Sequence, residues 1–335
     1  MIKLSIYKLY FTSPLHISDQ HNDDGYSLKS ISSDTLYAAM VACLAKTGHT
    51  IPDDGDLGFT ISSLFPYYQK EENSEPIYFL PMPLLAHQTE LADATMAKKV
   101  KKVKWVDTSL YNGILSGKDL SDHLSDIQES YLSMQPLPTG IDGTKEFLKA
   151  EVSQRVTLVS RTGDEDAMPY YVEKIVFKHH SGLYFIVQGD TNLIEEALSQ
   201  LSLEGIGSDR NIGFGFFEFS VDQLSLELPQ NAEHQIALSL LIPESEEQMK
   251  QLMDSDMVAY DFTRRGGWIT TYPFSTLRKN AIYGFMPGSV FSKAKEKDCM
   301  PIGKIVNLQP EVGELSPTHP IWRCGRSIML PIKLK

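Results

Sequence analysis

The first residues of the chain alternate between apolar and polar side chains. Ile2, Leu4 and Ile6 recur with a period of two, at which side chains return to the same face of a β-strand. The alternation stops before the turn expected at Pro14. We therefore expect a strand over residues 2–11.

The spacing of apolar residues then changes to three and four. Ser33 suits the N-cap of a helix, Asp34 complements the positive end of the helix dipole, and Gly48 suits the C-terminal stop. This pattern predicts a helix with a buried stripe formed by Leu36, Met40, Cys43 and Leu44.

The pattern loosens over about 50–150 into short helices, one strand-like stretch and proline-rich joints, which indicates a large insertion. Regular patterns then return. They predict strands at 152–160 and 170–177, the returning arm of a hairpin at 183–187, a helix at 191–201 and a last strand at 214–219. Without the insertion the order is strand, helix, strand, strand, helix, strand. That is the order of ferredoxin-like folds and of RNA-recognition modules.

A linker-like stretch follows residue 226, and a strand at 234–242 and a helix at 244–253 come after it. A second, more irregular copy of the same topology would account for them. The predicted fold class is α+β, with two ferredoxin-like (RRM-like) domains and antiparallel sheets. Residues 1–226 form the first domain, with the insertion, and 232–335 form the second.

Composition limits the partners of such a fold. The chain has 335 residues, 42% of them hydrophobic, which is enough for a sizeable core. A formal net charge of −12 argues against a protein that coats nucleic acid by itself, so any contact with nucleic acid requires a local basic strip.

No apolar run approaches the length of a membrane span, and the N-terminus lacks a cleavable signal pattern, so we expect a cytoplasmic protein with no membrane partner. Three cysteines without C-x-x-C spacing, Cys43, Cys299 and Cys324, support neither a disulfide framework nor a zinc site. We expect no metal and no cofactor.

The stretch EGIGSDRNIGFGFFEF carries the clearest binding chemistry. Its glycines allow positive φ and close approach of a ligand to the backbone, and they are Gly205, Gly207, Gly213 and Gly215. The polar tip between them supplies hydrogen-bonding groups and one cation, from Ser208, Asp209, Arg210 and Asn211. The loop over 205–215 is therefore a candidate phosphate-binding element.

Two nucleotide-binding motifs are excluded by spacing. G-x-G-x-x-G counted from Gly205 would need glycine where Arg210 stands, and the segment leads into a strand instead of a helix. The P-loop-like stretch from Gly113 to Asp119 is one residue short and ends in Asp. A glycine-rich hairpin without a ligand remains the alternative.

Basic residues mark three further candidates for RNA contact. The segment RRGGW places Arg264 and Arg265 beside Trp268, and Arg278 and Lys279 follow within reach. Cations beside an indole suit phosphates and stacked bases, although a solvated turn with a core Trp268 is the alternative. Five lysines fall within seven residues after 97, among them Lys98, Lys99 and Lys101, and could equally form a solvated helix or a disordered loop. Arg155 and Arg161 could extend this strip or be ordinary surface arginines.

Four separated motifs together resemble the RAMP superfamily of CRISPR proteins. They are SSDTLYAAM at 32–40 after SPLHI, the glycine loop, RRGGW, and GSVF at 288–291. Within the superfamily they are most similar to the fourth-subunit family of the type III-A Csm effector complex. The similarity runs from the first residues to about Phe291.

The resemblance implies a non-catalytic, RNA-binding subunit in antiviral defence that holds the 5′ handle of the CRISPR RNA (crRNA). It also implies contacts with the large signalling subunit, which makes cyclic oligoadenylate, and with the first backbone RAMP subunit. In this hypothesis the loop amides and Arg210 grip phosphates, and Ser33 and Asp34 shape the adjoining helix start.

One residue supports an enzymatic alternative. His16 follows the first strand, and in the repeat-cutting endoribonucleases of the same superfamily a histidine near this position serves as general acid or base on the 2′-hydroxyl. Nothing in the sequence supplies His16 with a partner. The alternatives are therefore a metal-independent CRISPR repeat endoribonuclease and an RNA-binding subunit in which His16 is a core or RNA-contacting residue.

Overall fold

The structure is a computed structural model. It describes residues 1–18, 26–84, 98–138, 146–157, 168–178, 180–293, 300–313 and 316–334. The predicted site residue Arg161 and the third cysteine, Cys299, lie outside the described residues.

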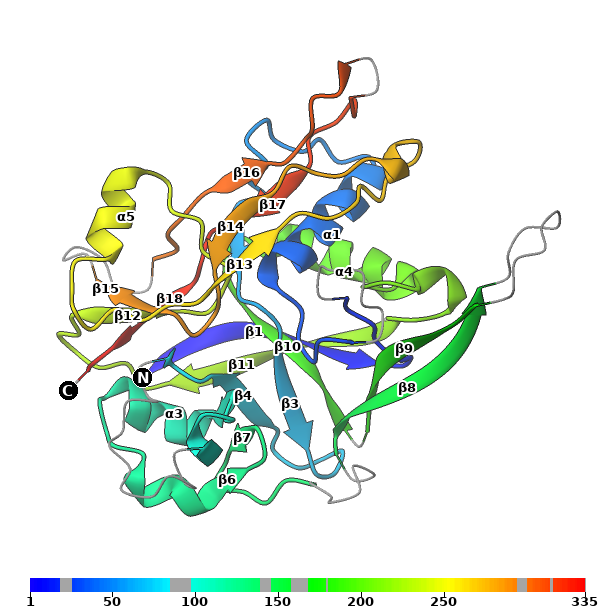
Figure 1. Ribbon diagram of the computed structural model, residues 1–335. Coiled ribbons are helices and arrows are strands. Elements are labelled where there is room, and N and C mark those ends of the chain that lie inside the picture. The colour runs from blue at the N-terminus through cyan, green and yellow to red at the C-terminus, as the bar shows by residue number, and fades with distance from the viewer. Residues whose placement is uncertain are drawn as a thin grey trace.

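A nine-stranded sheet crosses the centre of the molecule in the order β11-β1-β10-β3-β4-β5-β7-β6, and β2 also pairs with β10 (Figure 1). The pairs are antiparallel except β5 with β7. The strands are β1 (Ile2–Phe11), β2 (Phe59–Ile61), β3 (Phe65–Gln69), β4 (Ile77–Pro81), β5 (Trp105–Asp107), β6 (Ile127–Gln128), β7 (Tyr131–Leu132), β10 (His180–Gly189) and β11 (Phe217–Leu226).

The expected first strand is confirmed, but both of its faces are covered. Leu4 and Ile6 pack into one core, and Tyr7, Leu9 and Phe11 pack into another on the opposite face. The second core also receives the helices α1 (Ser33–Lys46) and α4 (Asn192–Glu204), and the first receives α3 (Thr108–Leu115). A strand between two long neighbours, β10 and β11, is buried on both sides in this way.

The helix at 33–46 is confirmed together with its buried stripe of Leu36, Met40, Cys43 and Leu44. Its cap was assigned wrongly: the N-cap is Ser32, and Ser33 is already the first helical residue. The hydroxyl of Ser33 instead accepts a hydrogen bond of 2.9 Å from the backbone N–H of Leu240.

The expected hairpin between 170–177 and 183–187 is wrong. The strand β9 (Met168–Phe177) pairs over its whole length with β8 (Leu148–Thr157), and the two form a separate arm (Figure 1). The mainly buried β10 instead pairs with β1, β2 and β3. Burial explains the difference, because an apolar strand belongs at the centre of a sheet, whereas β8 and β9 expose Val152 and Tyr171.

The described residues of the C-terminal half form three small antiparallel sheets and one α-helix. Their members are β12 (His234–Ala237), β15 (Val290–Ser292) and β18 (Met329–Ile332); β13 (Phe262–Arg265) and β14 (Ile282–Phe285); β16 (Ile305–Asn307) and β17 (Trp322–Cys324); and α5 (Glu246–Leu252). The expected helix at 244–253 is confirmed, and Ser245 caps it by accepting from Gln248 N–H.

The two halves share a core. Ile6 from β1, Ile236 from β12 and Leu330 from β18 pack in one cluster. Backbone contacts reinforce it, since Ser63 N–H donates to the carbonyl of Leu238 at 2.9 Å. The architecture is therefore α+β with antiparallel and mixed sheets. None of the described helices is long and apolar enough to cross a membrane.

Candidate nucleic-acid interface

The glycine loop connects the end of α4 to the start of β11. Its four glycines all have positive φ, at 76°, 95°, 95° and 76° for Gly205, Gly207, Gly213 and Gly215. A Cβ at Gly207 would lie 2.5 Å from the carbonyl oxygen of His16, whereas a Cβ at Gly213 would meet nothing within 4 Å. Gly207 therefore serves internal packing, and Gly213 borders open space.

Hydrogen bonds to the end of β1 fix the shape of the loop. Ser208 N–H donates to His16 O at 2.9 Å, and Gly215 N–H donates to Pro14 O at 2.8 Å. Ile206 N–H donates across the loop to Gly215 O at 3.0 Å. These three amides are used inside the protein, so binding chemistry depends on the tip.

The tip faces outward. Ser208 and Asn211 are exposed, and Arg210 is half-buried. Asp209 adopts a left-handed conformation with φ of 60°, and its carbonyl accepts from Ile212 N–H at 3.0 Å, which closes the turn. The loop thus presents one cation and two neutral polar side chains on a rigid support.

Arg155 reaches the loop from β8. Its Nη1 lies 2.6 Å from Asp209 Oδ2, and its guanidinium lies 5.3 Å from the centre of the Phe214 ring. The sequence singled out Arg155 as a possible extension of a basic strip, and the structure places it beside the tip. Its charge is paired there, so it holds Asp209 in place.

His16 lies under the loop, not on the surface. Its side chain is 2% exposed, and Nδ1 is 2.6 Å from the carbonyl oxygen of Glu173. Because a carbonyl only accepts, Nδ1 carries the proton in this contact. Through its own backbone carbonyl, His16 also anchors Ser208.

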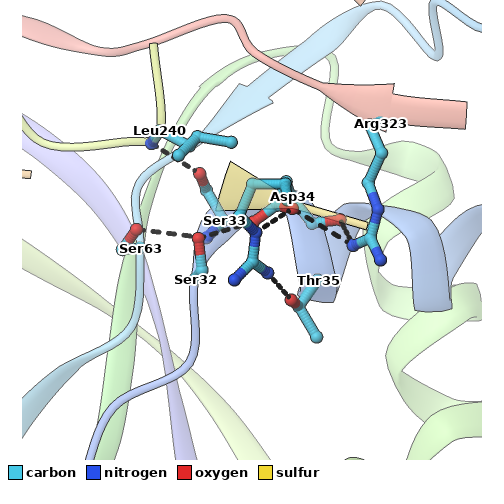
Figure 2. A network of polar contacts seen from close by, with 8 residues as sticks. Ser32, Ser33, Asp34, Thr35, Ser63, Leu240 and Arg323 are labelled. Atoms are coloured by element: carbon cyan, nitrogen blue, oxygen red, sulfur yellow. Dashed lines mark hydrogen bonds and ion pairs between the residues drawn. The ribbon is translucent and has the colours of Figure 1, made fainter. Parts of the chain in front are cut away.

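Ser33 and Asp34, on α1, take part in a buried junction with the C-terminal half (Figure 2), and Arg265 joins this junction from β13. Asp34 is fully buried, and its Oδ2 lies 2.9 Å from Arg265 Nε and 3.1 Å from Arg323 Nη1. Ser33 N–H donates to Ser63 Oγ at 3.1 Å. Burial by itself would raise the pKa of Asp34, but the two guanidinium groups and the Ser32 hydroxyl lower it below its usual value.

An exposed aromatic and basic surface lies next to this junction. Trp268 is 51% exposed, so the alternative in which it belongs to the core is wrong. The Arg278 guanidinium lies 4.6 Å from the centre of the indole, Arg264 is exposed on β13, and Lys279 is half-buried. Cations around an accessible indole suit a single-stranded nucleic acid.

The lysine run lies elsewhere. Lys98, Lys99 and Lys101 are exposed, while Val100 and Val103 between them are buried. The run leads into β5, which β4, β3 and β10 separate from β1. Four strand spacings of about 4.8 Å place β5 roughly 19 Å from β1, whose end holds the loop, and β11 lies one strand further away. Loop and lysine run are therefore separate surfaces.

One residue of the interface was missed by the sequence analysis. Arg323, on β17, completes the buried junction. No local pattern could have indicated it, because it lies 289 residues from Asp34 along the chain. Arg278, which the sequence placed within reach of the RRGGW segment, stacks on Trp268.

Comparisons with known proteins show which proteins the chain is similar to. Residues 230–332 match the family model of the CRISPR Csm4 C-terminal domain. The chain is 26% identical over 325 residues to a CRISPR system protein Csm4 of Mycobacterium tuberculosis (strain CDC 1551 / Oshkosh), covering 92% of this chain and 93% of the relative. A Csm4 of Streptococcus thermophilus is 22% identical over 317 residues, covering 91% and 93%.

Solved structures share the fold. A chain from a Csm1–Csm4 cassette in complex with cA4 superposes with a TM-score of 0.59 at 18% identity, covering 100% of this chain and 99% of that one. A chain from a Csm3–Csm4 subcomplex of the type III-A CRISPR-Cas interference complex gives 0.54 at 17% identity, covering 99% and 100%.

The chain is therefore similar to the type III CRISPR RAMP proteins, as the resemblance indicated. Within this class it is Csm4-like, with similarity to Csm4 proteins over 91–92% of its length.

Proposed function

We propose that the chain binds the 5′ handle of the crRNA in a type III-A Csm effector complex and has no catalytic role. The observation that carries this proposal is the glycine loop, whose backbone is tied to the end of β1 while Ser208, Arg210 and Asn211 face outward. A rigid loop with a cationic tip suits a phosphate backbone, because little ordering is needed on binding.

The contact residues divide into two groups by burial. Direct contact falls to the tip with Gly213, to the exposed Arg264 and Trp268, and to the half-buried Lys279. Gly205, Gly207, Gly215, His16, Ser33, Arg155 and Arg265 support these surfaces from within or through paired charges. The lysine run serves as a second strip that tracks phosphates without fixed geometry.

The proposed partners are the large signalling subunit and the first backbone subunit, in the cytoplasm. Fold similarity to chains from a Csm1–Csm4 cassette and a Csm3–Csm4 subcomplex supports both contacts. Within the complex we further propose two ferredoxin-like units, 1–226 and 232–335. The chain order β1, α1, β3, β10, α4, β11, with antiparallel neighbours in the order β11-β1-β10-β3, supports the first unit.

The nuclease alternative depends on His16. A general base must reach the 2′-hydroxyl of the substrate to take its proton, and the buried His16 is held against Glu173 O. Incubation of the purified chain with CRISPR repeat RNA, with and without magnesium, should give no discrete product. A product that disappears in His16→Ala would overturn the non-catalytic proposal.

A salt titration of a labelled handle oligonucleotide tests the binding proposal, with the chain alone or joined to its large partner. If about five phosphates are gripped, raising salt from about 50 to 200 mM lowers affinity roughly a hundredfold. Gly213→Val should weaken binding, because valine resists positive φ. Gly313→Val is the matched control, since Gly313 also has positive φ and an open Cβ position. Equal affinity of both variants and wild type would contradict the proposal.

A further inference from the structure

The junction between α1 and the C-terminal half holds more positive than negative charge. Arg265 and Arg323 pair with one carboxylate, Asp34, and the charges of these three residues act on Lys279; the four residues are called the junction cluster here. Asp34 is fully buried, and the side chains of Arg265 and Arg323 are 15% and 9% exposed. Among the described residues, no carboxylate forms an ion pair with Lys279.

Two donors of the junction cluster lack an acceptor in the described part of the chain. Arg323 uses Nη1 for Asp34, but its Nε is buried without a hydrogen-bond partner. The Lys279 ammonium is the other. Burial lowers the pKa of Lys279 to about 8, and repulsion from Arg323 adds to this, while Asp34 opposes it. Buried cations in excess of their counterions are expected where an anion binds.

The neighbouring surface indicates which anion. Lys279 N–H donates to Gly267 O at 2.9 Å, so the backbone of Lys279 lies beside the residue that precedes Trp268. Half of the Trp268 surface is exposed, and Arg264 is exposed on the adjoining strand. Arg278, whose guanidinium lies 4.6 Å from the centre of the indole, adds a cation for a phosphate beside an indole on which a base can stack.

We infer that the junction cluster is an anion site that takes one phosphate of the bound RNA strand, with Lys279 as its outermost ligand and Trp268 stacking a neighbouring base. This inference rests on the proposed function and deepens it, because it places a phosphate where the two halves of the chain meet. Asp34 on α1, Arg265 on β13 and Arg323 on β17 are the charged groups that act on Lys279.

A phosphate at Lys279 couples RNA binding to proton uptake. In the free chain Lys279 loses its proton around pH 8, and a phosphate favours the charged form. Affinity therefore falls as pH rises from 8 to 9.5, by at most about tenfold per pH unit for one linked proton. Without RNA contact at Lys279, this loss would be absent.

The test measures binding of labelled handle RNA by fluorescence anisotropy between pH 7 and 9.5, using the chain with its large partner where solubility requires it. Wild type should lose affinity above pH 8. Lys279→Arg should bind with a flat pH profile, and Lys279→Gln should bind about tenfold more weakly at pH 7, also with a flat profile. Lys250→Gln, at an exposed lysine of α5, should behave as wild type.

The possible outcomes separate the two proposals. If wild type does not bind handle RNA at any pH, the proposed function itself fails. If wild type binds and Lys279→Gln matches it at every pH, only the anion site is overturned. Inorganic phosphate provides a further test. Phosphate could raise the melting temperature of wild type but not of Lys279→Gln, while the substitution leaves RNA affinity unchanged. That result would assign the site to free phosphate and overturn the RNA assignment.

Discussion

The glycine loop and the junction cluster, the two proposed contacts with RNA, hold their polar groups in opposite ways. The loop satisfies its backbone with bonds to the adjoining end of β1 and leaves one cation at its tip. The junction cluster gathers three cations near one buried carboxylate, which pairs with two of them, and leaves a buried guanidinium N–H without an acceptor. As proposed, the loop is a rigid support that needs little ordering on binding, whereas the junction cluster stores electrostatic cost that a bound anion would relieve.

The largest effect expected is from Asp34→Ala. Removing the carboxylate leaves two guanidinium groups buried without their counterion, which costs about 3–5 kcal/mol of unfolding free energy. Asp56→Ala is the control, because its pair with Arg326 at 2.7 Å is partly exposed and contributes at most about 1 kcal/mol. Denaturant unfolding measures both.

The pH dependence of Asp34 has a defined sign. The pKa of Asp34 is lowered in the folded protein. Its contribution to the free energy of unfolding is therefore complete above the unfolded pKa of about 3.9 and is lost as pH falls through the folded value. Equal losses of unfolding free energy for Asp34→Ala and Asp56→Ala would show that the buried ion pairs of Asp34 do not stabilise the junction more than an exposed pair does.

Lys279→Met should stabilise the chain without RNA. The unfolded state binds more protons than the folded state between the folded pKa of about 8 and the ordinary value of 10.5, so wild-type stability rises with pH through this window. The shift sets an upper limit of about 3 kcal/mol for the gain at neutral pH. Thermal unfolding from pH 7 to 10 checks this. A variant that is less stable than wild type at pH 7 would contradict the claim that the charge of Lys279 destabilises the folded chain.

Gly213→Val should lower RNA affinity about tenfold with little change in the melting temperature beyond its backbone strain. Gly207→Val should instead lower stability as well, because its Cβ would collide with His16 O. Parallel melting and binding measurements on the two variants separate the packed from the open side of the loop. Similar melting losses for both would remove that distinction.

Arg210→Ala should have the smallest effect. It removes one phosphate contact and lowers the log–log salt slope of binding by about 0.7 for a single strand. Asn211→Ala, at a neutral residue of the same tip, should leave the slope unchanged. A salt slope that is the same for wild type and Arg210→Ala would place the phosphate contacts outside the tip.

Local patterns predicted much of the fold. The strand at 2–11, the helix at 33–46 and its buried stripe follow from periodicity, which neighbouring residues determine. Strand partners did not follow, because β10 finds β1 more than 170 residues away, and the pairing depends on burial at the centre of the sheet. The cap at Ser32 was missed because Ser33 is equally suited in sequence but is engaged by Leu240.

The candidate site shows the same division. The glycines of the loop are contiguous in sequence, so the loop could be recognised before its structure was known. The junction cluster joins segments around 34, 265, 279 and 323, and no local pattern connects Asp34 with Arg323. Burial also changed the interpretation of individual residues, since His16 and Arg265 carry suitable chemistry but are held inside.

Photo-crosslinking of the assembled complex tests the central claim most directly. A crRNA with 4-thiouridine at successive handle positions would be crosslinked, digested and mapped by mass spectrometry. The account predicts crosslinks to the tip at 208–213 and, from a neighbouring nucleotide, to Trp268. Crosslinks confined to the lysine run at 98–104, or a handle that crosslinks only to other subunits, would contradict it.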